Sequence, residues 1–370
     1  MNESTASKWA KVIPGLLFMF IIALLTMGTK TFGGEWTGIE GWIKTNSNFL
    51  GNVLKINHVI IVIIIGMVIR NTIGIPSWAQ AGVKTSRIFI KMGVILLGSL
   101  YSLTELATLG STSVLLIATF MFSTIIFTMW LGKKYNMHPG SAACLAAGAG
   151  VCGVSAIVAV APAVKARGED IAYSIATILS FGIVCLFTFP ILGHLLGLTP
   201  EQFGMWAGTG ILNSGQVLAA ALAFDPGTAD VPSISLKVGE IYNLTRVVFL
   251  PLVVLLITIL YARMSDDKTV DTTANAGKTF FSKFPLFVLG FIATVTLTSF
   301  GAFGPTNPVS ADLKAFREIY GWFFSIGLTG LGLQISFAEM RKAGGTPLVI
   351  GSVAGFLKAA LSLIVVLWLF

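Results

Sequence analysis

Residues 139–165, PGSAACLAAGAGVCGVSAIVAVAPAVK, decide the expected fold of this chain. They carry no charged side chain before Lys165, and the stretch is long enough to enter a bilayer. Its middle, 148–153, is a poor helix, because each glycine costs about 1 kcal/mol relative to alanine. Non-helical backbone at membrane depth persists only where protein buries it or where it lines a wet cavity. The stretch therefore predicts a broken membrane helix.

The composition is that of a polytopic membrane protein. Hydrophobic residues make up 55% of the 370 residues and charged residues 11%, whereas soluble domains carry about 25% charged residues. The basic residues behind the net charge of +8 lie in short loops between apolar runs, so we expect a lipid bilayer and no nucleic acid as partner. The three cysteines lie in apolar segments without the spacing of a metal site or a disulfide framework.

Eleven apolar runs approach bilayer length and predict an all-α protein with about 9–11 transmembrane helices. The runs lie near 12–28, 53–69, 88–102, 113–131, 141–164, 170–196, 203–224, 236–262, 284–300, 313–337 and 346–370. We expect 1–28 to hold a first transmembrane helix that is not cleaved, because no signal-cleavage pattern follows it. The whole chain, 1–370, is expected to form one transporter domain with a polar loop at 263–283.

A second interrupted segment is expected at 203–224. Its centre, 207–216 (AGTGILNSGQ), gathers amides and hydroxyls in an apolar run, where each unsatisfied polar group is costly. Such side chains commonly hold neighbouring helices together. Two breaks close together in the sequence favour the other interpretation, in which these groups face water or a substrate.

The loop charges suggest how the two breaks are arranged, because basic residues mark cytoplasmic loops. Lys133 and Lys134 precede the first broken segment, and Lys165 and Arg167 follow its apolar run. All four lie on the cytoplasmic side if 139–165 enters and leaves from the inside and 203–224 enters and leaves from the outside. Two crossed, broken spanning helices are the alternative.

Two internal echoes favour an inverted-repeat architecture. Residues 102–110 (SLTELATLG) resemble 336–344 (SFAEMRKAG), and 147–151 (AGAGV) resemble 207–211 (AGTGI). The first pair belongs to helices that would run in opposite directions, as inverted repeats require.

Arg246 stands well inside an apolar run, and an intramembrane cation needs a counter-charge, a cavity or a route to the interface. It precedes Arg263 by 17 residues (263 − 246), or roughly 25 Å along a helix, which places it near the far interface or in a vestibule. We expect it to attract an anion, with snorkelling as the alternative. Lys358 is also deep, and snorkelling or pairing is expected for it. Lys237 and Glu240 have the spacing of a local ion pair.

The chemistry of the apolar segments favours an anionic substrate. Broken helices present positive half-helix N-termini, which suit anions. Apart from Glu240, no carboxylate stands within an apolar run, which argues against cation–proton exchange. The sequence shows no nucleophile–base cluster, metal spacing or phosphate loop, so we expect no enzyme, no cofactor and no metal.

Several motifs together resemble the sulfate-exporter family of YeiH-like bacterial inner-membrane proteins. They are 13–15 (IPG), 66–71 (GMVIRN), 93–98 (GVILLG), 148–156 (GAGVCGVSA), 208–221 with its QV pair, 244–247 (LTRV) and 330–344. The resemblance covers nearly the whole chain. It implies a multi-pass secondary transporter of the inner membrane, distantly similar to bile-acid symporters and cation/proton antiporters, that exports sulfate, sulfite or an organosulfonate-like anion.

The chain departs from the family pattern at three positions. Asn213 stands where the family usually carries an acid, and Asn243 where it usually carries a lysine. Gly150 replaces a usual hydroxyl residue. The joint loss of an acid and a base resembles the neutralisation of an ion pair, so the coupling ion and the exact substrate stay open.

We expect the two breaks to form one binding site for a small anion, used by alternating access. Its expected residues are Gly148, Gly150, Cys152, Gly153, Ser155, Gly208, Thr209, Asn213, Ser214, Gln216, Asn243, Thr245 and Arg246. Glycines would allow close backbone approach, amides and hydroxyls would donate hydrogen bonds, and Arg246 would supply charge. A passive anion channel and an ion-coupled symporter or antiporter of another organic anion are the alternatives. A coupling ion is a further candidate partner, and a homodimer is one possible assembly.

Overall fold

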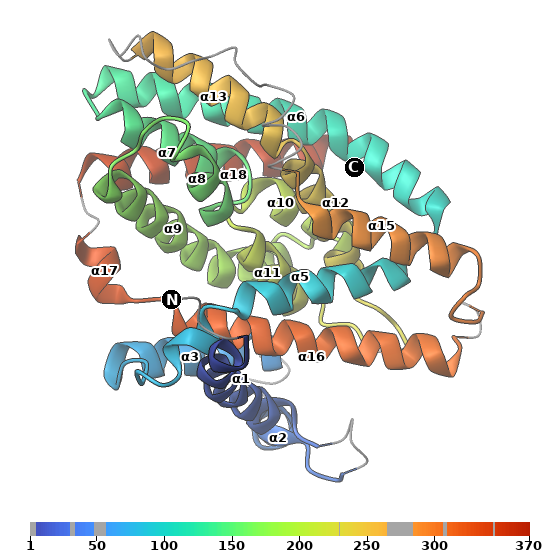
Figure 1. Cartoon of the computed structure of the whole chain (residues 1–370). Coiled ribbons are helices and arrows are strands. Elements are labelled where there is room, and N and C mark those ends of the chain that lie inside the picture. Colours follow the sequence, from blue (N-terminus) through green and yellow to red (C-terminus); the bar gives the residue numbers. More distant parts are fainter. Residues whose placement is uncertain are drawn as a thin grey trace. The chain divides into compact units, whose positions relative to one another are not determined.

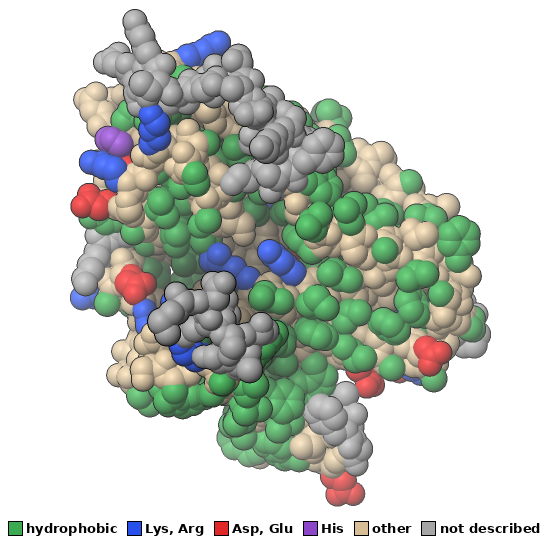
Figure 2. Space-filling view, viewed as in Figure 1, with side chains coloured by type: hydrophobic (Ala, Val, Ile, Leu, Met, Phe, Trp, Pro, Cys, Tyr) green, Lys and Arg blue, Asp and Glu red, His purple; other side chains and the backbone are tan. Residues whose placement is uncertain are grey.

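The computed structural model describes residues 5–29, 34–47, 57–228, 230–264, 284–305, 309–342 and 345–370. Every regular element in these ranges is a helix (Figure 1). This confirms the predicted all-α class. Most of the expected polar loop at 263–283 lies outside the described residues. Figure 2 shows hydrophobic side chains over much of the visible surface, as a protein in contact with lipid requires.

Four helices in the described ranges are long and apolar enough to cross a membrane. They are α1 (Thr5–Met27), α6 (Leu103–Lys134), α9 (Gly168–Leu195) and α18 (Thr346–Leu369). A fifth span results if α12 (Ile234–Val248) and α13 (Leu250–Met264), bent by 49°, count as one. Several of the eleven apolar runs are therefore not single membrane-length helices, because glycines, prolines or polar residues interrupt them.

Packing divides the chain into two compact units. Unit 1 comprises 1–103, 222–232 and 289–337, and unit 2 comprises 104–221, 233–288 and 338–370. Each unit collects segments that are distant in the sequence. The expectation of one transporter domain and of an inverted repeat stays a prediction.

Unit 1 is organised around α16 (Ala311–Leu333), which packs against α3 (His58–Thr72) and α5 (Ser86–Leu97). Figure 1 shows α5 and α16 side by side. Glycine permits the close approach of α3 and α16, because a Cβ at Gly66 would lie 2.8 Å from the carbonyl oxygen of Thr329. The helix α2 (Gly38–Asn46) joins this unit through Glu40, whose carboxylate lies 3.0 Å from His58 Nδ1.

In unit 2 the first interrupted segment forms two helices. They are α7 (Pro139–Gly150) and α8 (Val154–Val160), separated by residues 151–153. Gly153 caps α8 with φ of +78°, a conformation that disfavours side chains other than glycine. The sequence therefore ends α7 where the prediction placed the break.

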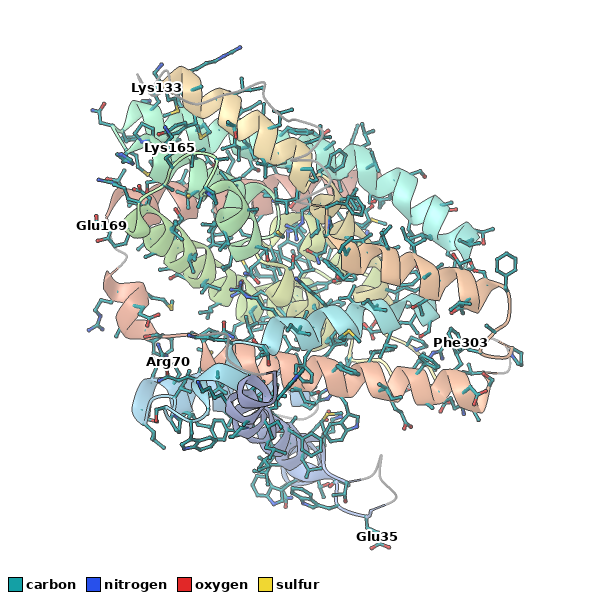
Figure 3. The ribbon with its side chains drawn as sticks, viewed as in Figure 1. Glu35, Arg70, Lys133, Lys165, Glu169 and Phe303 are labelled. Atoms are coloured by element: carbon teal, nitrogen blue, oxygen red, sulfur yellow. The ribbon has the colours of Figure 1, made fainter. Side chains whose placement is uncertain are left out.

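The two helices fold back on one another as a hairpin, here named hairpin 1. A Cβ at Gly148 would lie 2.9 Å from Ile157 Cδ1, and one at Gly140 would lie 3.4 Å from Ala166 Cα. Both pairs are symmetric about residues 152 and 153, as in an antiparallel hairpin with its tip there. Figure 3 shows Lys133 and Lys165, which flank the segment, toward the same end of unit 2.

The second interrupted segment forms α10 (Pro200–Gly210) and α11 (Ser214–Phe224), separated by residues 211–213. Both helices approach Gly239 of α12: a Cβ there would lie 3.3 Å from the Gly204 oxygen and 3.8 Å from Ala221 Cβ. Gly204 and Ala221 are symmetric about the break. α10 and α11 therefore lie against the same part of α12 and form a second hairpin, here named hairpin 2.

The hairpins start from opposite ends of α9. Hairpin 1 is held at the first turn of α9, where His138 Nδ1 lies 3.1 Å from Asp170 Oδ2. Hairpin 2 begins at Pro200, five residues after α9 ends at Leu195 (200 − 195). Since α9 has 28 residues, its ends are roughly 42 Å apart. The two tips therefore point toward one another.

The bent span α12–α13 passes both hairpins. α12 packs against α10 of hairpin 2, and α13 packs against α7 and α8 of hairpin 1. Pro251 stands just after the bend, where its missing N–H interrupts the ladder of helix hydrogen bonds. The bend therefore lies between the stretches of helix that contact the two hairpins.

Candidate functional site

The tips of the two hairpins meet in unit 2. A Cβ at Gly153 would lie 2.8 Å from Asn213 Nδ2 and 3.2 Å from Asn213 Cα, so the backbone of one tip touches the side chain of the other. The contact lies beside the middle of α9, because the Gln216 amide donates to the Leu179 carbonyl oxygen at 3.2 Å. We call residues 151–153 and 211–216 the tip junction.

Arg246 lies at this junction and is 0% exposed. One terminal nitrogen donates to the Ile211 carbonyl oxygen at 2.7 Å, and the other donates to Asn243 Oδ1 at 2.9 Å. The Ile211 oxygen belongs to the C-terminal end of α10, where the helix dipole favours a cation. Arg246 Nε has no hydrogen-bond partner among the described residues.

This position differs from the one that residue counting predicted for Arg246. The expected place was near the far interface or in a vestibule, about 25 Å from Arg263. α12 and α13, which carry Arg246 and Arg263, are bent by 49° relative to one another, so a count of residues along one straight helix does not apply to this pair. The structure instead encloses Arg246 between Ile211 and Asn243, away from the protein surface.

Asn243 joins three other polar side chains. Its Oδ1 accepts from Ser214 Oγ at 2.7 Å as well as from Arg246, and its Nδ2 donates to Glu240 Oε1 at 3.1 Å. Glu240, Asn243 and Arg246 stand three residues apart on one face of α12. The predicted pair of Lys237 with Glu240 is wrong, because Lys237 reaches Glu105 of α6 at 2.9 Å instead.

A second buried cation holds the other hairpin. Lys358 of α18 is 3% exposed, and its Nζ donates to the carbonyl oxygens of Ala149 at 3.0 Å and Gly150 at 3.3 Å. These are the last carbonyls of α7, so Lys358 completes the helix end rather than reaching for an interface. The first helix of each hairpin, α7 or α10, thus has a cationic side chain bound to the carbonyl oxygens at its C-terminal end.

The tip junction therefore collects positive charge. Arg246 and Lys358 interact electrostatically, and the buried carboxylate near them among the described residues is that of Glu240. The N-terminal end of α11 also faces the junction, where the Gly215 amide donates to Asn213 Oδ1 at 3.0 Å. The helix dipole adds partial positive charge at this end. Such an arrangement favours an anion.

Most of the predicted polar site residues come together at the junction. Cys152, Gly153, Asn213, Ser214, Gln216, Asn243 and Arg246 all belong to it or contact it. Three other predicted residues stand apart. The hydroxyls of Thr245 and Ser113 of α6 share a hydrogen bond of 2.8 Å, and Ser155 is exposed on α8. Thr209 is buried, and its hydroxyl has no hydrogen-bond partner within the described ranges.

Three of the predicted glycines approach neighbouring helices. A Cβ at Gly148 would meet Ile157 and Ile178, one at Gly150 would lie 2.5 Å from Ile125, and one at Gly208 would lie 2.7 Å from the Gly239 oxygen. Their close approach serves helix packing in this structure. Gly153 is the predicted glycine whose backbone lies at the contact between the tips.

The set of predicted site residues did not include Glu240, Lys358 or Gly182. The signal for the first two was present, since each is an ionisable group within an apolar run. Gly182 makes room for a site side chain, because a Cβ there would lie 1.6 Å from Gln216 Oε1. A single glycine in a long apolar helix gave no such indication.

Comparisons with known proteins agree over nearly the whole chain. The family model described as "Conserved hypothetical protein 698" matches residues 14–351. A UPF0324 membrane protein of Nitratidesulfovibrio vulgaris is 43% identical over 99% of this chain and 97% of its own length. A UPF0324 membrane protein of Agrobacterium fabrum is 29% identical over 96% of this chain and 93% of its own. No solved structure matches the chain. The chain is a member of the UPF0324 membrane-protein family.

Proposed function

We propose that this protein is a secondary transporter that moves a small anion across the bacterial inner membrane by alternating access. The observation that carries the proposal is the pair of opposed hairpins whose tips meet at two buried cations. Discontinuous helices that meet at mid-depth are the common form of a transporter's substrate site. The buried polar groups of the junction would otherwise be costly in a membrane.

The charges of unit 2 support an orientation for this transporter. Lys133, Lys134, Lys165 and Arg167 flank hairpin 1, and basic residues mark the cytoplasmic side. Hairpin 2 starts at the other end of α9, near the Glu105–Lys237 pair, since Ser235 of α12 donates to the Pro200 oxygen at 3.0 Å. In the proposed orientation hairpin 1 enters from the cytoplasm and hairpin 2 from outside.

The substrate class rests on charge and on resemblance. Arg246 and the N-terminal end of α11 suit a compact oxyanion, because both carry positive charge and Arg246 Nε is a donor without a hydrogen-bond partner among the described residues. The motifs shared with YeiH-like sulfate exporters make sulfate, sulfite or an organosulfonate the first candidates. We expect the protein to act without chemical change of the anion, and export to be its physiological direction.

A passive anion channel on the same fold is the competing function. The test is flux of radiolabelled sulfate into vesicles that contain the purified protein. A transporter gives saturable uptake that internal unlabelled sulfate accelerates. Flux that does not saturate, follows voltage and ignores internal sulfate would replace the transporter by a channel. Absence of flux for sulfate, sulfite and methanesulfonate would remove both.

A further inference from the structure

Glu240 is a buried carboxyl group with incomplete hydrogen bonding. It is 2% exposed, and Oε1 accepts one hydrogen bond from Asn243 Nδ2 at 3.1 Å. Oε2 has no partner in the described part of the chain. A buried carboxylate is normally stabilised by several donors or by a direct cation. Glu240 has neither, so its charge depends on groups one step away.

The charged and titratable groups around Glu240 come from several elements. Arg246, on the same helix, is linked to Glu240 through Asn243. Lys358 of α18 interacts electrostatically with Arg246, as does Cys152 of hairpin 1. Glu105 of α6 is paired with Lys237 one turn before Glu240. Gly204 and Gly208 of α10 pack against α12, and α11 contributes Ser214 to the network.

The net charge of the tip junction with its bound anion depends on the charge of that anion. When Arg246 and Lys358 are protonated and Glu240 is ionised, the three buried side chains together carry one positive charge in excess. A singly charged anion balances this excess. A doubly charged anion leaves one negative charge too many, and an uncompensated buried charge is strongly unfavourable. Protonation of Glu240 restores the balance.

We propose that Glu240 binds a proton when the tip junction holds a doubly charged anion, so that this anion and one proton cross the membrane together. This inference rests on the proposed function. The proton comes from water on the side to which the junction is open, and it binds at Oε2. It returns to water on the other side when the anion leaves. A singly charged anion requires no proton.

The experiment compares two probes of similar shape, sulfate and methanesulfonate, in vesicles that contain the protein and an internal pH dye. Acidification of the outside should accelerate sulfate uptake, by up to about tenfold per pH unit, the limit for one required proton. The dye should report proton uptake that follows sulfate uptake. Methanesulfonate uptake should carry no proton and change little with pH.

The variant Glu240→Gln keeps an oxygen that accepts from Asn243 and fixes the uncharged state. Its sulfate uptake should persist without pH dependence and without proton uptake. Its methanesulfonate uptake should fall, because the site now carries one positive charge too many for a single anionic charge. Glu105→Gln is the matched control, since it removes the carboxylate paired with Lys237. This control should keep the pH dependence of the wild type.

The outcomes separate the inference from the proposed function. Sulfate uptake by the wild type without proton uptake overturns the inference and leaves the transporter intact. Uptake of methanesulfonate without any uptake of sulfate also overturns the inference and leaves the proposed transporter function intact. Uptake of neither anion overturns both. The comparison of two anions in the wild type needs no variant, so it decides the matter even if Glu240→Gln does not fold.

Discussion

The backbone of Gly153 lies against the side chain of Asn213, so the tip of hairpin 1 leaves no room for a side chain at its contact with hairpin 2. The φ of +78° at Gly153 adds a second reason for glycine. This contact joins the tips of the two hairpins directly. A side chain at position 153 would therefore disturb the junction of the two tips.

Gly153→Ala should lower both stability and transport. The backbone conformation alone (φ +78°, ψ −124°) costs about 1–3 kcal/mol for alanine, and the collision with Asn213 adds about 1–3 kcal/mol of overpacking. Gly197→Ala is the matched control, because Gly197 has φ of +66° and open space around it. Thermal unfolding in detergent and sulfate flux are the measurements. Equal losses in the two variants would show that the contact between the tips has no role.

Arg246→Lys should fold but transport at least tenfold more slowly. Lysine keeps the charge, but its single ammonium group cannot reproduce the two directed donors toward Ile211 and Asn243. Arg263→Lys, at the exposed end of α13, is the control and should behave as the wild type. Flux and thermal unfolding are measured together. Normal flux in Arg246→Lys would argue against a precise role for the guanidinium.

Lys358→Met should loosen the tip of hairpin 1. The variant removes two hydrogen bonds from a charged donor to the last carbonyls of α7, which are worth about 1.5–3 kcal/mol each before desolvation of the lysine is counted. We expect Cys152, 5% exposed in the native protein, to react faster with a maleimide. The background Cys144→Ala with Cys185→Ala leaves it as the single thiol.

The control for this labelling is Lys133→Met, which removes an exposed lysine from the end of α6. It should leave the reactivity of Cys152 unchanged. An unchanged rate in Lys358→Met as well would mean that the lysine does not restrain the hairpin.

Hairpin 1 should place both of its flanks on one side of the membrane. Lys133→Cys and Glu169→Cys, in a background without native cysteines, are expected to react with an impermeant maleimide from the cytoplasmic side. Glu201→Cys, at the start of hairpin 2, should react from outside. Labelling of Lys133→Cys and Glu169→Cys from opposite sides would instead support a segment that spans the membrane.

Glu40 should make unit 1 sensitive to acid. Burial alone would raise its pKa, but the hydrogen bonds and charges of His58 and Lys44 outweigh burial and lower the pKa of Glu40 to about 2. The unfolded value is about 4.3. The stabilisation is therefore complete above about pH 5, shrinks as the unfolded chain takes up the proton, and is lost as the pH falls through 2.

The variant Glu40→Gln tests this dependence. Its unfolding temperature should lie below that of the wild type at pH 5, and the difference should shrink strongly by pH 2.5. Glu35→Gln removes an exposed carboxylate and should show no such dependence. A constant difference between Glu40→Gln and the wild type would exclude the carboxylate as the cause.

The sequence predicted the breaks well, because they follow from local chemistry. The glycines at 148–153 and 207–215 end α7 and α10 within a residue or two of the expected places. The echo between 147–151 and 207–211 falls on the same place in each hairpin, the end of its first helix. The basic residues beside Lys165 also indicated a segment that returns on itself, and the contact of Gly140 with Ala166 agrees with that hypothesis.

The partners of the polar groups could not be predicted, because they depend on which helices lie side by side. Lys358 is 208 residues from Gly150, and nothing in the local sequence indicates that it completes α7. The same limit explains Gly150 and Gly208, whose neighbours are helices rather than open space. Glu240 was visible as an intramembrane acid, but Asn243 had to be placed before its link to Arg246 could be seen.

The bend between α12 and α13 acts as a lever under the proposed function. Met264 lies 14 residues beyond Leu250, or roughly 21 Å along the helix. A change of about 10° in the bend would carry that end by about 4 Å, given this arm and a rise of about 1.5 Å per residue. Since α12 touches one hairpin and α13 the other, a single rotation at Pro251 shifts both contacts at once. Under the proposed function, one change in this bend would then open the binding site toward one side of the membrane and close it toward the other.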